Sequence, residues 1–372
     1  MIYADNAATT KLCAEAYEAM KPYLQGEYGN ASQPYSFAKS VKDALKSARE
    51  TIATYIGAAP EEIIFTSGGT ESDNWVIKSN LFSSKDKNGI VTSEIEHHAI
   101  LNSCKTMEEL GVPVKYVSVD NDGIINEAEF ADKLSQDVRL ASVMFANNEI
   151  GTIEPVKHLA VIAHEHGALF HSDAVQAVGH IPIDVHALGI DMLSSSAHKF
   201  NGPKGIGFLY LRRGLTLHNL MDGGSQEKGC RAGTENVASI VGMAAALKKN
   251  ISQMESTITH LRKIEGRFVS ELRMAGLSFI RNGADDHLPG NVNISFKNTE
   301  GEMLLHRLDL RGICVSTGSA CDSVNTQVSH VIKAIKVPAE YAEGTIRVTF
   351  GPDNTEEDAR QIATAIKKIL QR

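Results

Sequence analysis

The sequence predicts an α/β protein, in which helices cover both faces of a mostly parallel sheet and a smaller α+β domain follows. Between residues 62 and 211, short apolar runs alternate with segments that repeat apolar residues at helical spacing, and this alternation is typical of parallel sheets. The order of elements changes after residue 237. A chain of 372 residues, of which 42% are apolar, is long enough for two packed cores.

The N-terminal part of the chain predicts two helices separated by a loop. Apolar residues recur at helical spacing over Ala14–Leu24 and over Ser36–Ile56, and Gly57 ends the second helix. Gly26–Pro34 lies between the two helices and is rich in residues that break regular structure. Residues 1–12 are short and turn-like.

The middle of the chain predicts seven strands with helices between most of them, because short apolar or β-branched runs are bounded by turn signals. In a sheet of this kind, a site forms where the carboxyl ends of the strands meet. The expected strands are Glu62–Thr66, Ile90–Ser93, Val114–Val119, Val138–Phe145, Ala168–His171, Asp191–Ser196 and Gly205–Leu211. Two of the expected helices end near Leu81 and Leu110, and two more cover Glu127–Leu134 and Val156–His166.

The C-terminal part predicts a long helix and then a smaller domain. The helix runs from about Val237 to Ala275, and we expect it to be kinked or broken. We place a large domain at 13–255 and a small domain at 1–12 and 256–372. The elements expected in the small domain are the strands Asn291–Phe296 and Thr345–Phe350 and the helices Gly301–Leu310, Val328–Ile335 and Thr355–Leu370.

Composition argues against several classes of protein. Lysine and arginine number 37 against 45 acids, and the formal net charge of −8 disfavours nucleic acid or an anionic membrane as a partner. No apolar run is long enough to span a bilayer and the N-terminus has no secretory signal pattern, so we expect a cytoplasmic protein. An odd number of cysteines without a C-x-x-C pair indicates neither a disulfide framework nor a zinc finger. The cysteines are Cys13, Cys104, Cys230, Cys314 and Cys321.

Lys199 is the first candidate for chemistry. It comes directly after the expected strand Asp191–Ser196 and before a turn rich in glycine and proline. A lysine at the end of a buried strand can be a desolvated amine that forms a Schiff base with a carbonyl. A lone lysine is more often a solvated surface charge, so the interpretation depends on the residues at neighbouring strand ends.

The segment Ser67–Ser72 predicts an anion-binding turn between a strand and a helix. Glycines let the backbone approach an anion, and free N–H groups at the start of a helix attract it. The natural donors are the N–H groups of Gly69 and Thr70 and the Thr70 hydroxyl. An ordinary capped turn that binds nothing is an equally good interpretation of this segment alone.

Asp173 and His97 follow shortly after expected strands. Asp173 suits a protonated pyridine nitrogen, with a helix N-cap as the alternative, and Gln176 one turn later can reach a phenolic oxygen. His97 can stack on a heteroaromatic ring and move a proton, with a core histidine as the alternative. A metal site on His97 and His98 is the weaker interpretation, because adjacent residues do not face one way.

One ligand accounts for the lysine, the acid, the imidazole and the anion turn together. It is pyridoxal 5′-phosphate (PLP), an aldehyde-bearing pyridine with a phosphate. Asn147 and Asn148, which follow another strand, are amides that need partners if they are buried. In the small domain, Gly, Ser and Ala surround Cys321, which predicts an exposed thiol; without a PLP site, an inert loop cysteine would be the default.

These segments, in this order, resemble the cysteine desulfurases of the NifS/IscS kind, in the class V aminotransferase group of PLP enzymes. The resemblance covers nearly the whole chain. It implies an aspartate-aminotransferase-like fold of type I, with a seven-stranded sheet in the large domain. It rests on YADNAATT at 3–10, TSGGTESDN at 66–74, EHHA at 96–99, NNEIG at 147–151, Asp173 with Gln176, SAHKFNGPKG at 196–205, RAGT at 231–234 and STGSAC ending at Cys321.

The resemblance also implies a role for each candidate residue, and it implies no metal. The catalytic residues are Lys199, which binds PLP, Cys321, which takes the sulfur, and His97, which stacks on the ring and moves protons. The implied cofactor contacts are Asp173 to the ring nitrogen, Asn148 and Gln176 to the ring oxygen, Gly69, Thr70, Ser196 and His198 to the phosphate, and Thr234 to the phosphate of the partner subunit. The implied substrate-binding residues are Arg347, which takes the carboxylate, Asn30 and Asn148.

The implied reaction converts L-cysteine to L-alanine and leaves the sulfur on Cys321 as a persulfide. An acceptor protein of iron–sulfur cluster assembly or tRNA thiolation would then take the sulfur from Cys321. The resemblance also implies a homodimer, and we expect the protein to bind neither a membrane nor nucleic acid directly. Three features depart from the family pattern. Tyr35 replaces a usual histidine after Asn30, Asp322 follows Cys321 and opposes thiolate formation, and the sequence stops at Arg372, where housekeeping members carry a tail that docks a scaffold.

Other assignments stay open on the sequence alone. A selenocysteine lyase or a class V aminotransferase would keep the same cofactor and differ in substrate and in the need for Cys321. A metal or iron–sulfur carrier is the more distant alternative, and the scattered cysteines speak against it.

Overall fold

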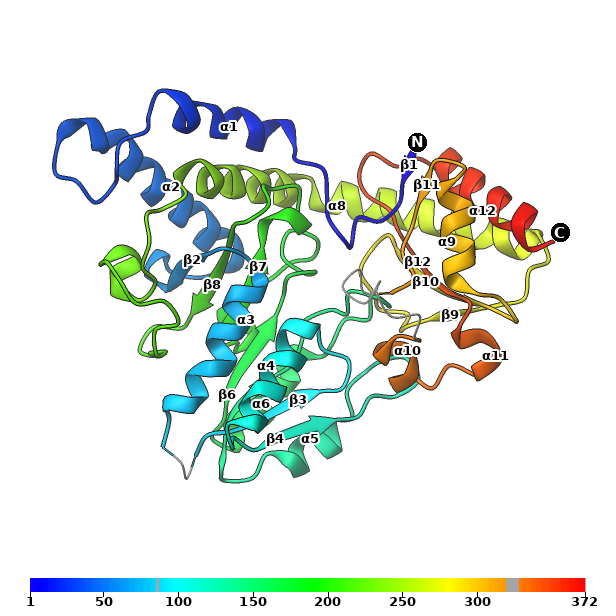
Figure 1. Cartoon of the computed structure of the whole chain (residues 1–372), viewed down its shortest axis with the longest axis horizontal. Coiled ribbons are helices and arrows are strands. Elements are labelled where there is room, and N and C mark those ends of the chain that lie inside the picture. The colour runs from blue at the N-terminus through cyan, green and yellow to red at the C-terminus, as the bar shows by residue number, and fades with distance from the viewer. Residues whose placement is uncertain (85–86, 319–327, 372) are drawn as a thin grey trace.

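The computed structural model describes residues 1–84, 87–318 and 328–371. Its central element is a seven-stranded sheet of order β2-β8-β7-β6-β5-β3-β4 (Figure 1). All neighbours pair in parallel except β8, which is antiparallel to β2 and β7. The mostly parallel seven-stranded sheet is therefore confirmed, and each strand overlaps its expected range. The strands are β2 (Ile63–Thr66), β3 (Gly89–Ser93), β4 (Val114–Val117), β5 (Val138–Ser142), β6 (Leu169–Asp173), β7 (Met192–Ser196) and β8 (Gly207–Leu211).

Helices cover both faces of this sheet, because alternate residues of a strand point to opposite sides. In β2, Ile64 packs into the core under α3 (Gly69–Lys78) and α4 (His98–Glu109), whereas Ile63 and Phe65 belong to the core on the other face. The helices that contribute to that second core are α1 (Ala14–Gln25), α2 (Lys39–Ile56), α5 (Glu127–Lys133), α6 (Val156–Glu165), α7 (Val185–Leu188) and the first part of α8 (Val237–Met274).

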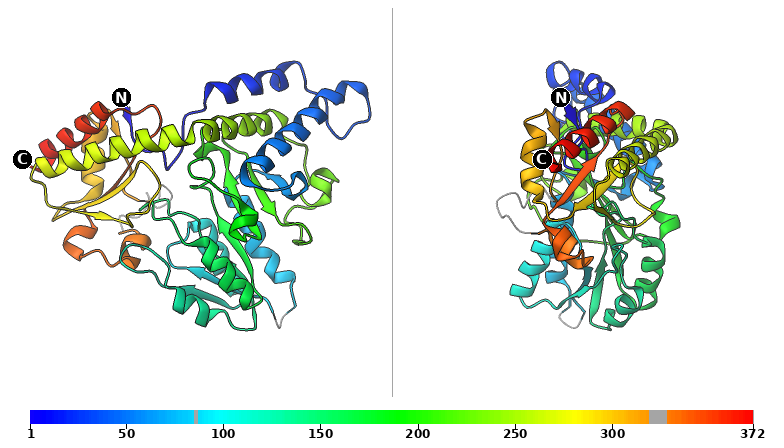
Figure 2. Two further views of the ribbon diagram at one scale, coloured as in Figure 1. Left: turned by 180° about the vertical axis from the view of Figure 1, so that it is seen from behind. Right: turned by 90° about the vertical axis from the view of Figure 1, so that its right-hand side faces the viewer.

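Helix α8 is one continuous α-helix of 38 residues, so the expected kink or break is wrong. Gly242 serves helix packing instead: a Cβ at this position would lie 2.6 Å from Cγ of Met20 on α1. The first part of α8 packs in the large core, and the segment from Leu261 to Leu272 packs in a separate core. Figure 2 shows the helix running along one half of the molecule and on to the other.

The separate core contains a three-stranded antiparallel sheet of order β12-β10-β9 and a short parallel pair, β1 with β11. Several elements of this half of the molecule are too short for a periodic pattern, so sequence analysis missed β1, β9, β11 and α11 here and α7 in the large core. The elements of this core are β1 (Ile2–Tyr3), β9 (Phe279–Asn282), β10 (Asn291–Phe296), α9 (Gly301–Asp309), β11 (Ile313–Cys314), β12 (Thr345–Thr349) and α12 (Glu356–Leu370). The short helices α10 (His330–Ala334) and α11 (Ala339–Ala342) pack instead in a small core that also contains Ile95 and Met144.

Residues 4–10, which we call the N-terminal strap, connect the two cores. Figure 1 shows this dark blue segment descending from β1 into the space between the two halves. The Asn6 N–H donates to the Thr349 carbonyl on β12, and the Thr10 N–H donates to the His198 carbonyl after β7. The strap therefore lies where the small sheet meets the strand ends of the large one. Among the described helices, none has both the length and the apolar character that crossing a membrane requires.

Candidate active site

A cavity of about 240 Å³ lies at the carboxyl ends of β5, β6 and β7, beside the N-terminal strap and β12. This is where open α/β sheets place their ligands. The predicted site residues that line it are Gly69, Thr70, His97, Asn148, Asp173, Gln176, Ser196, His198, Lys199 and Arg347. The lining residues that sequence analysis did not single out are Ala7, Ala8, Asp73, Met144, Ala146 and Val175.

The turn between β2 and α3 has the geometry of an anion site. Gly68 has φ of 150°, a conformation that side chains disfavour, and a Cβ on Gly69 would lie 2.4 Å from Cγ2 of Val175. Gly68 is therefore required by its backbone conformation, and Gly69 by the close approach of the Val175 side chain. The first residues of α3 line a second opening of about 370 Å³ together with Ser196 and His198, so the start of a helix and two polar side chains border one space.

Two buried carboxyl groups lie side by side in the cavity. Asp173 ends β6 and accepts the Val175 N–H at 2.9 Å, whereas Oδ1 of Asp73 on α3 has no hydrogen-bond partner among the described residues. Burial raises the pKa of both groups, and the charge of Asp173 raises the pKa of Asp73 further. Two carboxylates this close do not ionise together easily, so we assign the proton to Asp73.

Behind this pair, His171 on β6 is fully buried and bonded to serines of both neighbouring strands. Its Nδ1 lies 2.9 Å from Ser142 Oγ and its Nε2 lies 3.0 Å from Ser194 Oγ. Burial lowers the pKa of His171 to about 3, so the ring is neutral. Nε2 is also 3.8 Å from Oδ1 of Asp73, and a neutral ring leaves the acid without a cationic partner on this side.

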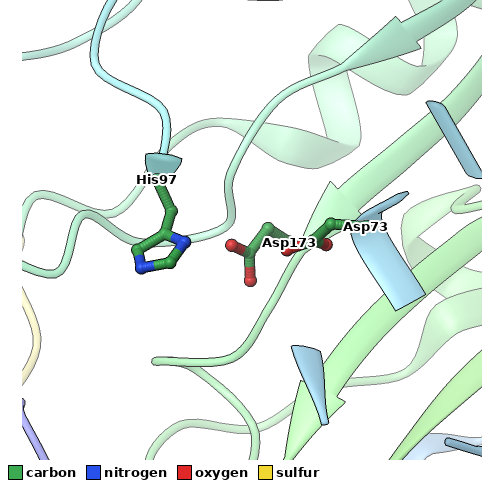
Figure 3. A group of neighbouring side chains, drawn as sticks. All are labelled: Asp73, His97 and Asp173. Atoms are coloured by element: carbon green, nitrogen blue, oxygen red, sulfur yellow. The ribbon is translucent and has the colours of Figure 1, made fainter. Parts of the chain in front are cut away.

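His97 caps helix α4 and turns its ring toward the two carboxyl groups (Figure 3). Its Nδ1 accepts the Ala99 N–H at 3.1 Å, which leaves the proton of the neutral ring on Nε2. Burial and the charge of Lys199 lower the pKa of His97 to about 4. The imidazole is therefore neutral at physiological pH and can accept or pass on a proton.

The three groups drawn in Figure 3 also have the donor atoms of a metal site. One atom each of Asp73, His97 and Asp173 lies within 4.8 Å of the others, and two carboxylates with an imidazole suit a divalent cation. Lys199 lines the same cavity, and its charge already depresses the pKa of His97. That charge opposes a second cation in the same place.

Lys199 ends a short 3-10 turn after β7 and reaches the N-terminal strap. Its Nζ donates to the carbonyl oxygens of Ala7 at 2.6 Å and Ala8 at 2.9 Å. Gln176 donates to the same Ala7 oxygen at 3.0 Å, and His198 Nδ1 lies 3.1 Å from the Thr9 hydroxyl. The strap thus holds three of the predicted site residues in place.

Arg347 enters the cavity from β12 of the small sheet. It is only 1% exposed, donates from Nη2 to Asp5 Oδ1 at 2.8 Å and donates from Nη1 to the Asn148 carbonyl at 2.9 Å. The strand reaches the segment before Cys321, because backbone hydrogen bonds pair Arg347 with Ser316. Cys321 itself lies outside the described residues.

Two predicted residues do not reach the cavity of this chain. Asn30 lies in the loop before α2, where its Oδ1 accepts the Ser32 N–H at 2.8 Å, and Thr234 is exposed. The segment that carries Thr234 is nevertheless held to the anion turn, because Arg231 forms a bidentate ion pair with Glu71 on α3 at 2.8 and 3.0 Å. Sequence analysis did not anticipate this pair, since its members are 160 residues apart.

The chain is similar to known proteins over its whole length. Residues 2–362 match the family model described as aminotransferase class-V. A relative from Dictyoglomus turgidum named cysteine desulfurase IscS is 48% identical over all of this chain and 95% of its own length. A relative of the same name from Methanosarcina thermophila is 44% identical over all of this chain and 92% of its own length.

Solved structures give the same result. A structure titled NIFS-like protein matches with a TM-score of 0.93 at 36% identity, over all of this chain and 99% of its own. A structure titled SspA in complex with cysteine matches with a TM-score of 0.85 at 34% identity, over 95% of this chain and 99% of its own.

Proposed function

The chain belongs to the class V aminotransferase family, and on that premise we propose that it is a cysteine desulfurase that moves the sulfur of L-cysteine to its own Cys321. One observation carries the proposal: Lys199, Asp173 and His97 meet in one cavity with Arg347. The full-length relatives named cysteine desulfurase IscS support the activity, and the relative titled SspA in complex with cysteine supports the substrate.

We propose PLP as the resident cofactor, because the cavity suits each part of it. Asp173 is a buried carboxyl group that favours a cationic partner, which a protonated ring nitrogen provides. Gly68 and Gly69 leave the start of α3 free of side chains for a phosphate, with Ser196 and His198 beside it. When it is bound, PLP supplies an electron sink for the charge left by loss of the α-proton.

The residues of the chain divide the remaining work. Lys199 is placed where its amine would bind the cofactor and would act as the base that removes the α-proton. Arg347, Asn148 and Gln176 line the cavity. Arg347 would bind the substrate carboxylate, and the two amide side chains would help to hold the cofactor. The neutral His97 ring, with its proton on Nε2, would contact the cofactor and would move the thiol protons.

The overall reaction balances without a further reagent. L-cysteine and the Cys321 thiol give L-alanine and a Cys321 persulfide: a carbon–sulfur bond breaks, a sulfur–sulfur bond forms and one hydrogen moves to carbon. The described segment before Cys321 is bonded to Arg347 through Ser316, which supports delivery of the thiol to the substrate. We propose that an acceptor protein then takes the sulfur, in iron–sulfur cluster assembly or in tRNA thiolation.

The test is an assay of L-alanine and protein persulfide from L-cysteine, with the wild type and with Cys321→Ala. We expect stoichiometric alanine and persulfide from the wild type and neither from the variant. Sulfide release that persists without Cys321 would contradict its role. A higher turnover of selenocysteine that does not need Cys321 would instead favour a selenocysteine lyase, and amino transfer to an oxo acid would favour an aminotransferase.

We also propose a homodimer in which Thr234 reaches the phosphate site of the partner. Thr234 is exposed in the single chain, and the pair of Arg231 with Glu71 holds its segment at the edge of the anion turn. Thr234→Ala should weaken PLP binding without changing the mass in sedimentation equilibrium.

The absorption spectrum of the purified protein separates PLP from the metal alternative. Bound PLP gives an absorption band that borohydride abolishes, whereas a chelator would abolish the band of a bound metal.

A further inference from the structure

The Arg347 guanidinium is buried with its hydrogen bonds only partly formed. Nη2 and Nη1 are engaged with Asp5 and with the Asn148 carbonyl, whereas Nε has no hydrogen-bond partner among the described residues. A buried N–H without a partner costs free energy. Because Arg347 lines the cavity, this uncommitted donor marks the place where an anionic group of a ligand fits.

Asp5 contacts Arg347 from a fixed position in the N-terminal strap. Its backbone forms a bridge with Thr349 on β12, and its carbonyl accepts the Tyr3 hydroxyl and the Ala8 N–H, both at 3.0 Å. The Asp5 side chain is 18% exposed and is not among the residues that line the cavity. A ligand in the cavity therefore meets Arg347 with Asp5 still attached.

We propose that Asp5 is a positioning residue for the substrate carboxylate: it orients the Arg347 guanidinium and offsets part of its charge, so that an α-carboxylate binds and is released again. The inference rests on the proposed function, because it takes Arg347 as the carboxylate site. The fork geometry of arginine permits two anions at once, since the five N–H groups point in different directions.

The opposing charge has a consequence for affinity. A buried arginine without a counter-ion attracts a carboxylate more strongly than one that is already paired, and the product L-alanine carries the same carboxylate as the substrate. Asp5 therefore weakens the binding of product as well as of substrate. Asp5 does not line the cavity. It therefore does not compete with the ligand carboxylate for the side of Arg347 that faces the cavity.

The experiment compares Asp5→Asn with the wild type as PLP-loaded holoenzymes. Asparagine keeps an oxygen that accepts from Nη2 and removes the charge. Calorimetry measures the Kd of L-alanine and of ethylamine, which is alanine without its carboxylate. We expect about tenfold tighter binding of L-alanine, equivalent to ~1.4 kcal/mol, an unchanged Kd for ethylamine, and a lower KM for L-cysteine without a higher kcat.

Asp353→Asn is the matched control. It removes the same charge from an exposed side chain that pairs with Lys11 at 3.7 Å, with both side chains 83% exposed, and it should change neither Kd. If Asp5→Asn does not yield folded holoenzyme, Asp5→Ser makes the same comparison with a smaller neutral acceptor. Loss of folding in both variants would make Asp5 a structural residue and overturn the proposal.

Three other results would also overturn it. They are unchanged or weaker binding of L-alanine to Asp5→Asn, an equal change for ethylamine, and the same change in Asp353→Asn. Failure of the proposed function is a separate outcome, because the wild type would then make no alanine from L-cysteine while the comparison of L-alanine with ethylamine still reports on Asp5.

Discussion

Replacing Asp73 by asparagine tests whether the two carboxyl groups of the cavity share one negative charge. Burial and the charge of Asp173 raise the pKa of Asp73, so the folded state binds this proton more tightly than the unfolded state does. Stability from such a group is present at low pH and is lost as pH rises toward the folded pKa. Asparagine resembles the protonated acid in shape and cannot ionise, so the variant should not show this loss.

The magnitude follows from the separation of the two groups. Their nearest atoms are within 4.8 Å, and two unit charges at that distance repel by ~3.5 kcal/mol at an effective dielectric constant near 20. A chain of 372 residues unfolds with an entropy of roughly 0.8 kcal/mol/K. The variant should therefore melt about 4 °C above the wild type near pH 9, and at nearly the same temperature near pH 4, close to the ordinary aspartate pKa of 3.8, where little of this loss has begun.

The assay is thermal unfolding of PLP-free protein, followed by the fluorescence of Trp75. This is the only tryptophan of the sequence, and it is buried on α3 two residues from Asp73. Asp191→Asn is the control, because Asp191 is a buried acid paired with Arg212 at 2.8 Å and its loss should destabilise at both pH values. An equal shift for Asp73→Asn at both pH values would refute the shared charge.

Three further substitutions test other parts of the site. A Cβ on Gly69 would lie 2.4 Å from Val175, so Gly69→Ala should weaken PLP binding, measured by equilibrium dialysis, about tenfold, and adding Val175→Ala should restore most of it. Glu71 keeps a low pKa because Arg231 and a backbone N–H offset the effect of its burial. The wild type should therefore lose stability as pH falls through that pKa, whereas Glu71→Gln should not, and parallel melting curves would contradict this. Burial raises the pKa of Glu96 to about 8, so the wild type should lose about 1.4 kcal/mol per pH unit between 4.5 and 8, and denaturant unfolding of Glu96→Gln should show no such slope.

The fold could be predicted as far as periodicity extends. Strand β2 shows why. Ile63 and Ile64 belong to different cores, because helices cover both faces of the sheet. A strand buried on both faces is a continuous apolar run, which can be recognised in the sequence. The pair β1 with β11 has only two residues in each strand, which is too short for any pattern. The expected kink or break in α8 was wrong because the helix is held along its length by two different cores, and such tertiary support is not visible in a local pattern.

The site could be predicted where a residue follows a strand, and less well where it lies on a helix or a strap. Lys199 and Asp173 stand at strand ends and line the cavity. Asp73 lies one turn after Gly69, so its position on the buried face of α3 was available from helical spacing. Asp5 gave no such signal, because its partner Arg347 is 342 residues away.

The charges of the cavity give a physical reason for the proton on Asp73. Inside the cavity, Lys199 and Arg347 each carry a positive charge and Asp173 a negative one, and Asp5, bonded to Arg347 outside the lining, carries a second negative charge. If Asp73 is protonated, the four charges sum to zero, which matches an amino acid substrate whose ammonium and carboxylate also cancel. If Asp73 were ionised, these groups would carry a net negative charge, which would oppose the negative charge that develops on the substrate as it loses the α-proton. Keeping one buried acid neutral thus serves catalysis as well as stability.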